Sequence, residues 1–294
     1  MQTSNKQFIG IDLFSEAGGL SLGASMAGID VALAVEKDYH AAATYARNHP
    51  NTKLWNVDIE ELVELPNINT DKFSIVLFGG PPCQGFSTSN KRTWNNSNPQ
   101  NHLYKEFIRI AKLTQPEWIV FENVTGFTNL TSGDFLGILI NDLTDLGFEC
   151  SHSILTASDH GIPQRRNRFF LIGSKYKGKI AIDIPTNENT VSVADAISDL
   201  PTLDNGANMD VLPYKTAAEN TYAQALRKNL KECSGHLVSR NSNVVIERYT
   251  YINQGENWRS IPSELMLDYT DRTRCHTGIY HRLREDRPSV VGLF

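Results

Sequence analysis

Short apolar runs alternate with amphipathic stretches over the first part of the chain. Runs rich in β-branched and aromatic residues predict strands at 8–14, 31–36, 55–58, 74–78, 118–124, 148–156 and 168–173. Apolar residues at helical spacing predict helices at about 19–27, 39–48, 103–113 and 135–146. Strands and helices that alternate in this way indicate an α/β fold with a largely parallel sheet.

The pattern changes near Lys175, where helical and strand signals weaken and prolines and asparagines become frequent. We therefore expect a domain boundary there, with a smaller mixed lobe beyond it. Two basic stretches lie in this second part, at 226–231 and 272–287. Such stretches are compatible with phosphate contacts and equally with an ordinary solvated surface.

The composition is that of an ordinary globular protein, with 294 residues, 40% of them hydrophobic and 21% charged. A net charge of -5 excludes a generally basic coat for nucleic acid but leaves room for a local basic groove. The four cysteines are far apart, which argues against a zinc site or a disulfide framework. The chain shows no leader-like segment and no run of 18 apolar residues, so we expect no membrane insertion and a cytoplasmic location.

The first predicted strand runs into a glycine turn and a helix, which is the beginning of a nucleotide-type pocket. Gly18 and Gly19 would let the backbone approach a ligand closely. Glu36 ends the next strand about twenty residues later, where an acid commonly binds ribose hydroxyls. Asp58 ends the third predicted strand and could accept a hydrogen bond from a purine amino group. The dinucleotide pattern Gly-x-Gly-x-x-Gly is missing, so a NAD-binding enzyme is not indicated.

A second candidate feature is the stretch from Gly79 to Ser87, which follows the predicted strand at 74–78. Two prolines make a stiff corner from which the thiol of Cys83 can project beyond the end of the strand. A free cysteine is more often a small buried apolar residue, but this setting favours a reactive thiol. Glu122 also ends a predicted strand, so neighbouring parallel strands would bring it near Cys83. The polar segment after Ser87 predicts a loop that could close over the site.

These segments, in this order and spacing, resemble the DNA cytosine carbon-5 methyltransferases. The resemblance rests on Pro81-Pro82-Cys83-Gln84, on Glu122-Asn123-Val124 and on the run from Gln164 to Arg168, and it covers nearly the whole chain. It implies a Rossmann-like methyltransferase sheet at 1–174, a mixed target-recognition region at 175–277 and a partial return to the catalytic domain at 278–294. It further implies double-stranded DNA as the substrate and a bacterial or phage modification enzyme of the kind found in restriction-modification systems.

The resemblance also implies a role for each candidate residue. Cytosine carbon 5 is a weak nucleophile, so a thiolate must first add to carbon 6, and Cys83 matches that thiolate. Glu122 would act as an acid at ring nitrogen 3, with Arg168 and Arg166 holding the base or orienting Glu122. The methyl donor, S-adenosyl-L-methionine, would lie among Phe14, Gly18, Gly19, Glu36 and Asp58, with Pro82 near its methyl end. Contacts to a flipped-out base and its DNA would come from Gln84, Ser87 and Arg165, with the loop from Ser87 to Asn101 closing behind the base.

Two departures from the family pattern lead to further expectations. Glu16 occupies a position that is usually glycine in the first motif. The family's final motif does not appear before Phe294, which predicts a truncated chain or a second polypeptide that completes the fold. A DNA-binding remnant without activity is therefore one alternative function. A transfer-RNA cytosine methyltransferase is another, although its Cys-Phe-Thr signature is not found.

Overall fold

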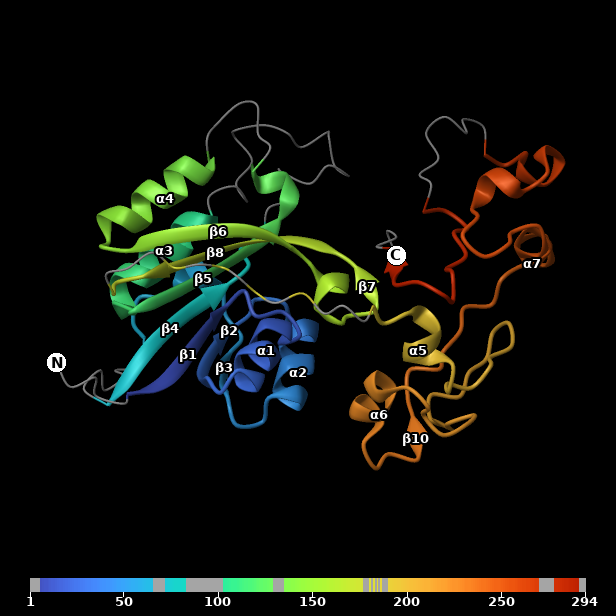
Figure 1. Ribbon diagram of the computed structural model, residues 1–294, viewed down its shortest axis with the longest axis horizontal. Helices are drawn as coiled ribbons and strands as arrows, with labels where there is room; N and C mark the ends of the chain where they lie inside the picture. The colour runs from blue at the N-terminus through green and yellow to red at the C-terminus, as the bar shows by residue number, and fades with distance from the viewer. Residues whose placement is uncertain are drawn as a thin grey trace. The chain divides into compact units, whose positions relative to one another are not determined.

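The computed structural model describes residues 6–65, 72–82, 103–128, 135–176, 190–269 and 278–290, together with 180, 182, 184 and 186. The chain forms two compact units (Figure 1). The first comprises Met1–Leu155 and Asn167–Ile184, and the second comprises Thr156–Arg166 and Pro185–Phe294. The two units therefore interleave along the sequence.

The first unit is built on a seven-stranded sheet with the order β3-β2-β1-β4-β5-β8-β6. The pairs between β1, β2, β3, β4 and β5 are parallel, and β8 runs antiparallel to β5. Leu13 pairs with both Val35 and Gly79, and Gly79 pairs with Phe121, so the carboxyl ends of four strands meet at one edge. The strands are β1 (Gln7–Leu13), β2 (Asp30–Val35), β3 (Lys53–Trp55), β4 (Phe73–Gly79), β5 (Trp118–Val124), β6 (Glu149–Thr156) and β8 (Asn167–Ser174).

Helices cover both faces of this sheet (Figure 1). They are α1 (Gly19–Met26), α2 (Tyr39–Asn48), α3 (Leu103–Thr114) and α4 (Phe135–Asp145), with short 3-10 turns η1 (Ile59–Glu61) and η5 (Thr125–Thr128). Alternate residues of a strand point to opposite faces. Ile11 and Leu13 therefore pack with α3 and α4, whereas Val76 and Phe78 pack on the face that α1 covers.

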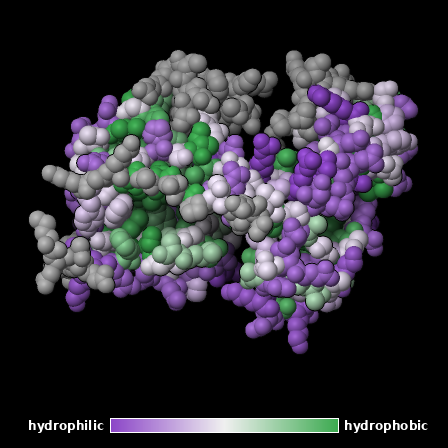
Figure 2. All heavy atoms as spheres, viewed as in Figure 1, coloured by the Kyte–Doolittle hydropathy of each residue, from purple (hydrophilic) through white to green (hydrophobic). Residues whose placement is uncertain are grey.

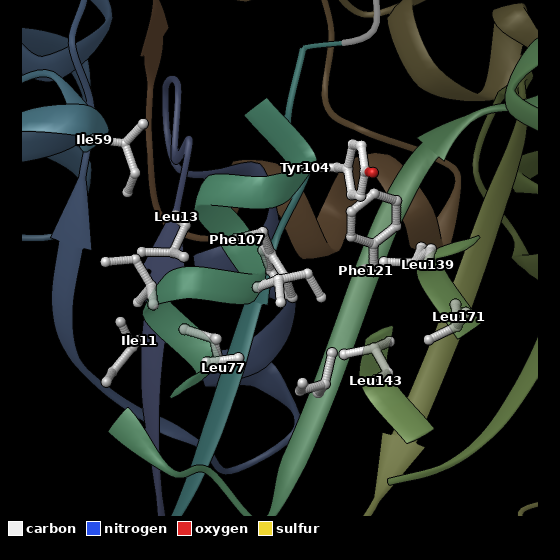
Figure 3. Close-up of a cluster of buried hydrophobic side chains, with 14 of the residues drawn as sticks. Ile11, Leu13, Ile59, Leu77, Tyr104, Phe107, Phe121, Leu139, Leu143 and Leu171 are labelled. Carbon is white, nitrogen blue, oxygen red and sulfur yellow. The ribbon is translucent and has the colours of Figure 1, made fainter. Parts of the chain in front are cut away.

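The larger core lies between the sheet and the pair α3 and α4 (Figure 3). Phe107 of α3 is fully buried and meets the ring of Phe121 edge to face, with the ring centroids 5.4 Å apart. Leu139 and Leu143 extend this core from α4. The core also includes Ile59 and contacts Phe14, so it extends to the carboxyl edge of the strands.

The predicted α/β class is confirmed, and so are the strands and helices predicted for the first unit, apart from one boundary. The strand predicted at 55–58 is wrong in its limits, because β3 ends at Trp55. The side chain of Asn56 donates hydrogen bonds to the carbonyls of Glu36 and Lys37, at 2.8 and 3.1 Å, and turns the chain out of the sheet. Asp58 then caps η1 and does not close a strand.

The second unit consists of short elements. Its helices are α5 (Val193–Ile197), α6 (Thr221–Arg227) and α7 (Asn243–Thr250), and its 3-10 turns are η6 (Ala157–His160), η7 (Trp258–Ser260) and η8 (Ser263–Met266). Its strands are β7 (Gln164–Arg165) paired with β11 (Ser289–Val290), and β9 (Leu212–Pro213) paired with β10 (Glu232–Cys233). In the view of Figure 2, hydrophilic residues dominate the visible surface of this unit.

A buried arginine helps to hold this small unit together. The side chain of Arg248 is only 6% exposed and donates hydrogen bonds to the carbonyl of Leu265 and the hydroxyl of Tyr280, both within 2.8 Å. It also forms an ion pair with Asp268. A small apolar cluster around Met266 lies beside this network. Within the described part of both units, no helix has the length and apolar character that a membrane crossing requires.

Candidate active site

A cavity of about 980 Å³ opens at the carboxyl edge of the sheet in the first unit. Its walls come from the segments that follow β1 (14–17), β2 (35–41), β3 (57–60) and β4 (80–82). Leu103 at the start of α3 adds an apolar side chain. Ligands of open α/β sheets bind at this edge, because the loops there diverge to opposite faces of the sheet.

The turn after β1 has an unusual backbone. Phe14, Glu16 and Gly18 have left-handed φ values of 58°, 47° and 95°, and the helix α1 begins immediately afterwards. A Cβ atom on Gly18 would lie 2.2 Å from Nε2 of His49, which forms a 3.0 Å hydrogen bond with the Gly18 carbonyl. Gly18 thus permits the close packing that shapes the turn. A Cβ on Gly19 would meet open space.

Glu36 connects two walls of the cavity. One carboxylate oxygen accepts a hydrogen bond from the backbone N–H of Glu16 at 2.8 Å, and the other accepts from the N–H of Asp38 at 2.6 Å. Each carboxylate oxygen has a second lone pair, so each can accept a further hydrogen bond from a hydroxyl group. The predicted position of Glu36 at a ribose site is compatible with this geometry.

Asp58 lies in the third wall and forms an ion pair with Lys37. The hydrogen bond from Lys37 lowers the pKa of Asp58, and the same bond raises the pKa of Lys37. The second oxygen of Asp58 accepts from the N–H of Glu60 at 3.2 Å. The carboxylate therefore orders the turn that lines the cavity, in addition to facing it.

Arg109 supports this wall from α3, and the sequence did not reveal it. Its guanidinium donates to the carbonyls of Ile59 and Leu62, at 2.8 and 2.6 Å, and to Glu106 at 2.7 Å. The planar guanidinium can bind two carbonyls and a carboxylate at once, which fixes the turn after Asp58. Arg109 stands within an ordinary amphipathic helix, so the sequence carries no local signal of this role.

A buried polar network lies at the end of β1. Asp12 is fully buried, and burial raises its pKa from 3.8 to about 7. Ser21 of α1 donates its hydroxyl proton to Asp12 at 2.6 Å, so Tyr45 of α2 must donate to Ser21 in their 2.7 Å contact. The other oxygen of Asp12 has no partner among the described residues. The network ties β1, α1 and α2 together next to the turn that lines the cavity.

The structure brings Glu122 and Arg168 together at the same edge of the sheet. They come from the antiparallel neighbours β5 and β8, and Nε of Arg168 lies 2.8 Å from Oε1 of Glu122. Each side chain is 23% exposed, so the pair is accessible but largely enclosed. The other oxygen of Glu122 rests against Gly80, where an added Cβ would approach it to 2.6 Å.

Asn123 connects the end of β5 to the proline corner that follows β4. Its side chain is buried and donates a hydrogen bond to the Pro81 carbonyl at 3.2 Å. Pro82, the next residue, lines the cavity. The carboxylate of Glu122, the proline corner and the cavity are therefore adjacent. Cys83, Gln84, Ser87 and the predicted closing loop up to Asn101 lie outside the described residues.

Arg165 and Arg166 belong to the second unit, whereas Arg168 belongs to the first. Arg165 is exposed in β7, which pairs with β11. Arg166 is half-buried, and its carbonyl accepts a hydrogen bond from Ala157 at 2.9 Å. No cluster of metal-ligating side chains occurs in the parts of the chain described here.

Comparison with known proteins assigns this architecture to a family. The family model of the C-5 cytosine-specific DNA methylases matches residues 8–285. The type II methyltransferase M1.HphI of Haemophilus parahaemolyticus is 34% identical over 285 residues, which are 95% of this chain and 69% of that protein. M.DdeI of Desulfomicrobium norvegicum is also 34% identical, over 86% of this chain and 63% of its own length.

A solved structure supports the same conclusion. It is described as a DNA modification methyltransferase encoded within a prophage of E. coli, and it superimposes with a TM-score of 0.73 at 28% identity. The match covers 96% of this chain and 81% of that one. This chain thus spans roughly two thirds of the length of the two type II relatives and more of the solved one.

Proposed function

Because this chain belongs to the family of C-5 cytosine-specific DNA methylases, which use S-adenosyl-L-methionine as methyl donor, we propose that it methylates carbon 5 of cytosine in duplex DNA. The target would be a flipped-out cytosine within a specific sequence. The observation that carries this proposal is the ion pair of Glu122 and Arg168, which lies beside the proline corner and next to the cavity.

The cavity suits the proposed cofactor. Its volume of about 980 Å³ is at the upper end of the usual range for pockets that bind small molecules and cofactors. Glu36 can accept hydrogen bonds from ribose hydroxyls, and Phe14 and Ile59 offer apolar surface for the purine ring. The amino end of α1 favours the carboxylate of the cofactor. When bound, S-adenosyl-L-methionine supplies an electrophilic methyl group, which we place near Pro82.

The chain's own residues would activate the base. The Cys83 thiolate adds to carbon 6 of cytosine, and electron density then moves toward ring nitrogen 3 and carbon 5. Glu122 donates a proton at nitrogen 3 and thereby stabilises the adduct. Carbon 5 becomes nucleophilic enough to accept a methyl group. Loss of the carbon-5 proton and expulsion of the Cys83 thiolate then restore the aromatic ring.

Arg168 is proposed to orient Glu122. Its guanidinium binds one carboxylate oxygen and fixes the plane of the carboxylate, whose other oxygen lies on the side of Gly80. Arg166 is proposed to hold the carbonyl oxygen of the same base. Gln84, Ser87 and Arg165 are proposed to contact the DNA around the flipped nucleotide.

Base flipping requires unstacking of the cytosine, at a cost of a few kcal/mol that contacts to the DNA must offset. We propose that the loop from Ser87 to Asn101 closes behind the flipped base. We propose that residues 175–277 recognise the DNA sequence around the target cytosine. In this proposal, the catalytic domain comprises residues 1–174, and the chain returns to that domain at 278–294. Direct readout of base edges would come from side chains of that region.

Trapping on DNA that contains 5-fluorocytosine tests the mechanism. Fluorine at carbon 5 cannot leave as a proton does, so the covalent adduct accumulates after methyl transfer. We expect a cofactor-dependent adduct between the wild-type chain and a mixture of duplexes of diverse sequence, and none with Cys83→Ser. Cys150→Ser is the matched control, because Cys150 is a half-buried thiol whose pKa burial raises to about 11. An adduct of equal yield with Cys83→Ser would overturn the assignment of the nucleophile.

A further inference from the structure

Glu16 keeps a side chain at a backbone position that suits glycine. Its φ of 47° is in the left-handed region, which residues with a Cβ atom rarely adopt. The side chain is exposed and lines the cavity. Its own N–H is held by Glu36, so the turn is ordered through the backbone without any help from the carboxylate. The carboxylate is therefore free to serve a purpose other than forming the turn.

Among the described residues, the cavity wall carries five carboxylates and one lysine. Three of the carboxylates have structural partners. Glu36 accepts two backbone N–H groups, Asp38 caps α2, and Asp58 forms the ion pair with Lys37. Lys37, the one cation among the described residues of the wall, thus pairs with Asp58. What remains is an excess of negative charge that faces the cavity.

Glu16 and Glu60 are the other two carboxylates, and neither side chain has a hydrogen-bond or ion-pair partner among the described residues. Both are exposed. Glu60 follows Asp58 on the wall proposed for the purine. Glu16 lies between Phe14 and Ala17 in the turn next to α1, on the side where the methionine part of the cofactor is proposed to bind.

We propose that Glu16 makes this pocket prefer the positively charged sulfonium cofactor over its neutral thioether product, and so favours replacement of the product by fresh cofactor after each methyl transfer. The inference rests on the proposed function. S-adenosyl-L-methionine carries one more positive charge than S-adenosyl-L-homocysteine and is otherwise nearly the same molecule. A carboxylate in the pocket wall attracts that additional charge. The ammonium and carboxylate of the amino-acid group cancel in net charge and occur in both molecules, so the affinity for the product depends much less on Glu16.

The wall is partly exposed to solvent, which limits how strongly the charge of Glu16 can affect the affinity for the cofactor. Removing one unit charge from a partly solvated wall should change the affinity for a monovalent cation by about threefold to tenfold. The preference should shrink as salt is added, because exposed charges are screened over about 10 Å at 0.1 M ionic strength.

Titration calorimetry with the full chain tests this inference. The ligands are the sulfonium cofactor, the thioether product, and an analogue in which an ammonium-bearing carbon replaces the sulfonium. We expect Glu16→Gln to raise the dissociation constants of the two cationic ligands about threefold to tenfold and that of the product less than twofold. Asp30→Asn is the control, because Asp30 is exposed at the opposite end of β2. It should change none of the three constants.

Equal changes for the cationic ligands and the neutral product, or no change in any of them, would overturn the inference. Glu16→Gly is the second variant, because glycine accepts the left-handed backbone and keeps the turn folded if glutamine disturbs it. If the wild-type chain bound neither cofactor nor product, the proposed function would fail as well. If wild type bound both and was trapped on 5-fluorocytosine DNA, an unaltered preference in the variants would refute only the role of Glu16.

Discussion

The buried carboxyl of Asp12 should make the stability of the first unit depend on pH. Burial raises its pKa from 3.8 to about 7, so the folded protein keeps this group neutral up to nearly neutral pH. In the unfolded chain the carboxyl ionises near pH 4. Between these values the folded state holds a proton that the unfolded state has lost. The free energy of unfolding therefore falls as the pH rises through this window and levels off above pH 7.

Asp12→Asn should remove this dependence. Asparagine has the shape of the neutral acid, cannot ionise, and still offers an oxygen to the Ser21 hydroxyl. The pKa difference of about 3 units corresponds to about 4 kcal/mol over the whole titration, at about 1.4 kcal/mol per unit. Part of this stabilisation is already lost at pH 5, because the carboxyl of the unfolded chain ionises near pH 4. We expect the stability of the variant relative to wild type to increase by about 2 to 3 kcal/mol between pH 5 and pH 8.

Urea unfolding, followed by circular dichroism at the two pH values, measures this change. Asp30→Asn is the control, since it removes an exposed carboxylate from the same sheet and should leave the pH dependence as in wild type. A stability difference between Asp12→Asn and wild type that stays constant from pH 5 to pH 8, within about 0.5 kcal/mol, would refute the reasoning. It would mean that the carboxyl titrates alike in the folded and unfolded states.

Three further substitutions test the supports of the site. Arg109→Gln removes hydrogen bonds to two carbonyls of the turn at 59–62. It should weaken cofactor binding about tenfold and lower the free energy of unfolding by about 2 kcal/mol. An unaltered affinity for the cofactor in calorimetry would contradict this. Gly80→Ala places a Cβ 2.6 Å from the Glu122 carboxylate and should lower methyl transfer to DNA at least about 100-fold; near-normal turnover would show that the corner is not rigid. Arg248→Met removes a buried guanidinium from its partly buried acceptors at Leu265 and Tyr280 and should cost about 2 kcal/mol in urea unfolding. A loss below about 0.5 kcal/mol would count against the network.

The elements of the first unit could be predicted because their signals are local. Apolar β-branched runs and helical spacing of apolar residues are properties of adjacent positions, and strands such as β4 and β5 match the predicted ranges closely. The end of β3 was missed because it depends on Asn56, whose side chain bonds to carbonyls about twenty residues earlier in the chain. No local pattern encodes such a contact.

The placement of the segment from Gln164 to Arg168 also could not be predicted from the sequence. Along the sequence it forms one basic turn, and its residue types favour recognition of a base or a phosphate. In the structure it divides, because β7 pairs with Ser289–Val290 in the second unit while Arg168 enters β8 of the first. The division arises from a pairing between segments more than one hundred residues apart, which hydrophobic spacing cannot reveal.

The succession of strands and helices along the chain, the α/β class and the types of reactive group at the strand ends are encoded locally, because propensity and chemical identity belong to each residue and its neighbours. Which of these groups meet depends on the packing of distant segments. This packing pairs Glu122 with Arg168, sets Glu122 against Gly80, braces the turn after Asp58 with Arg109, and buries Asp12 so that its pKa rises. These properties depend on distance and dielectric environment, which exist only once distant segments pack together.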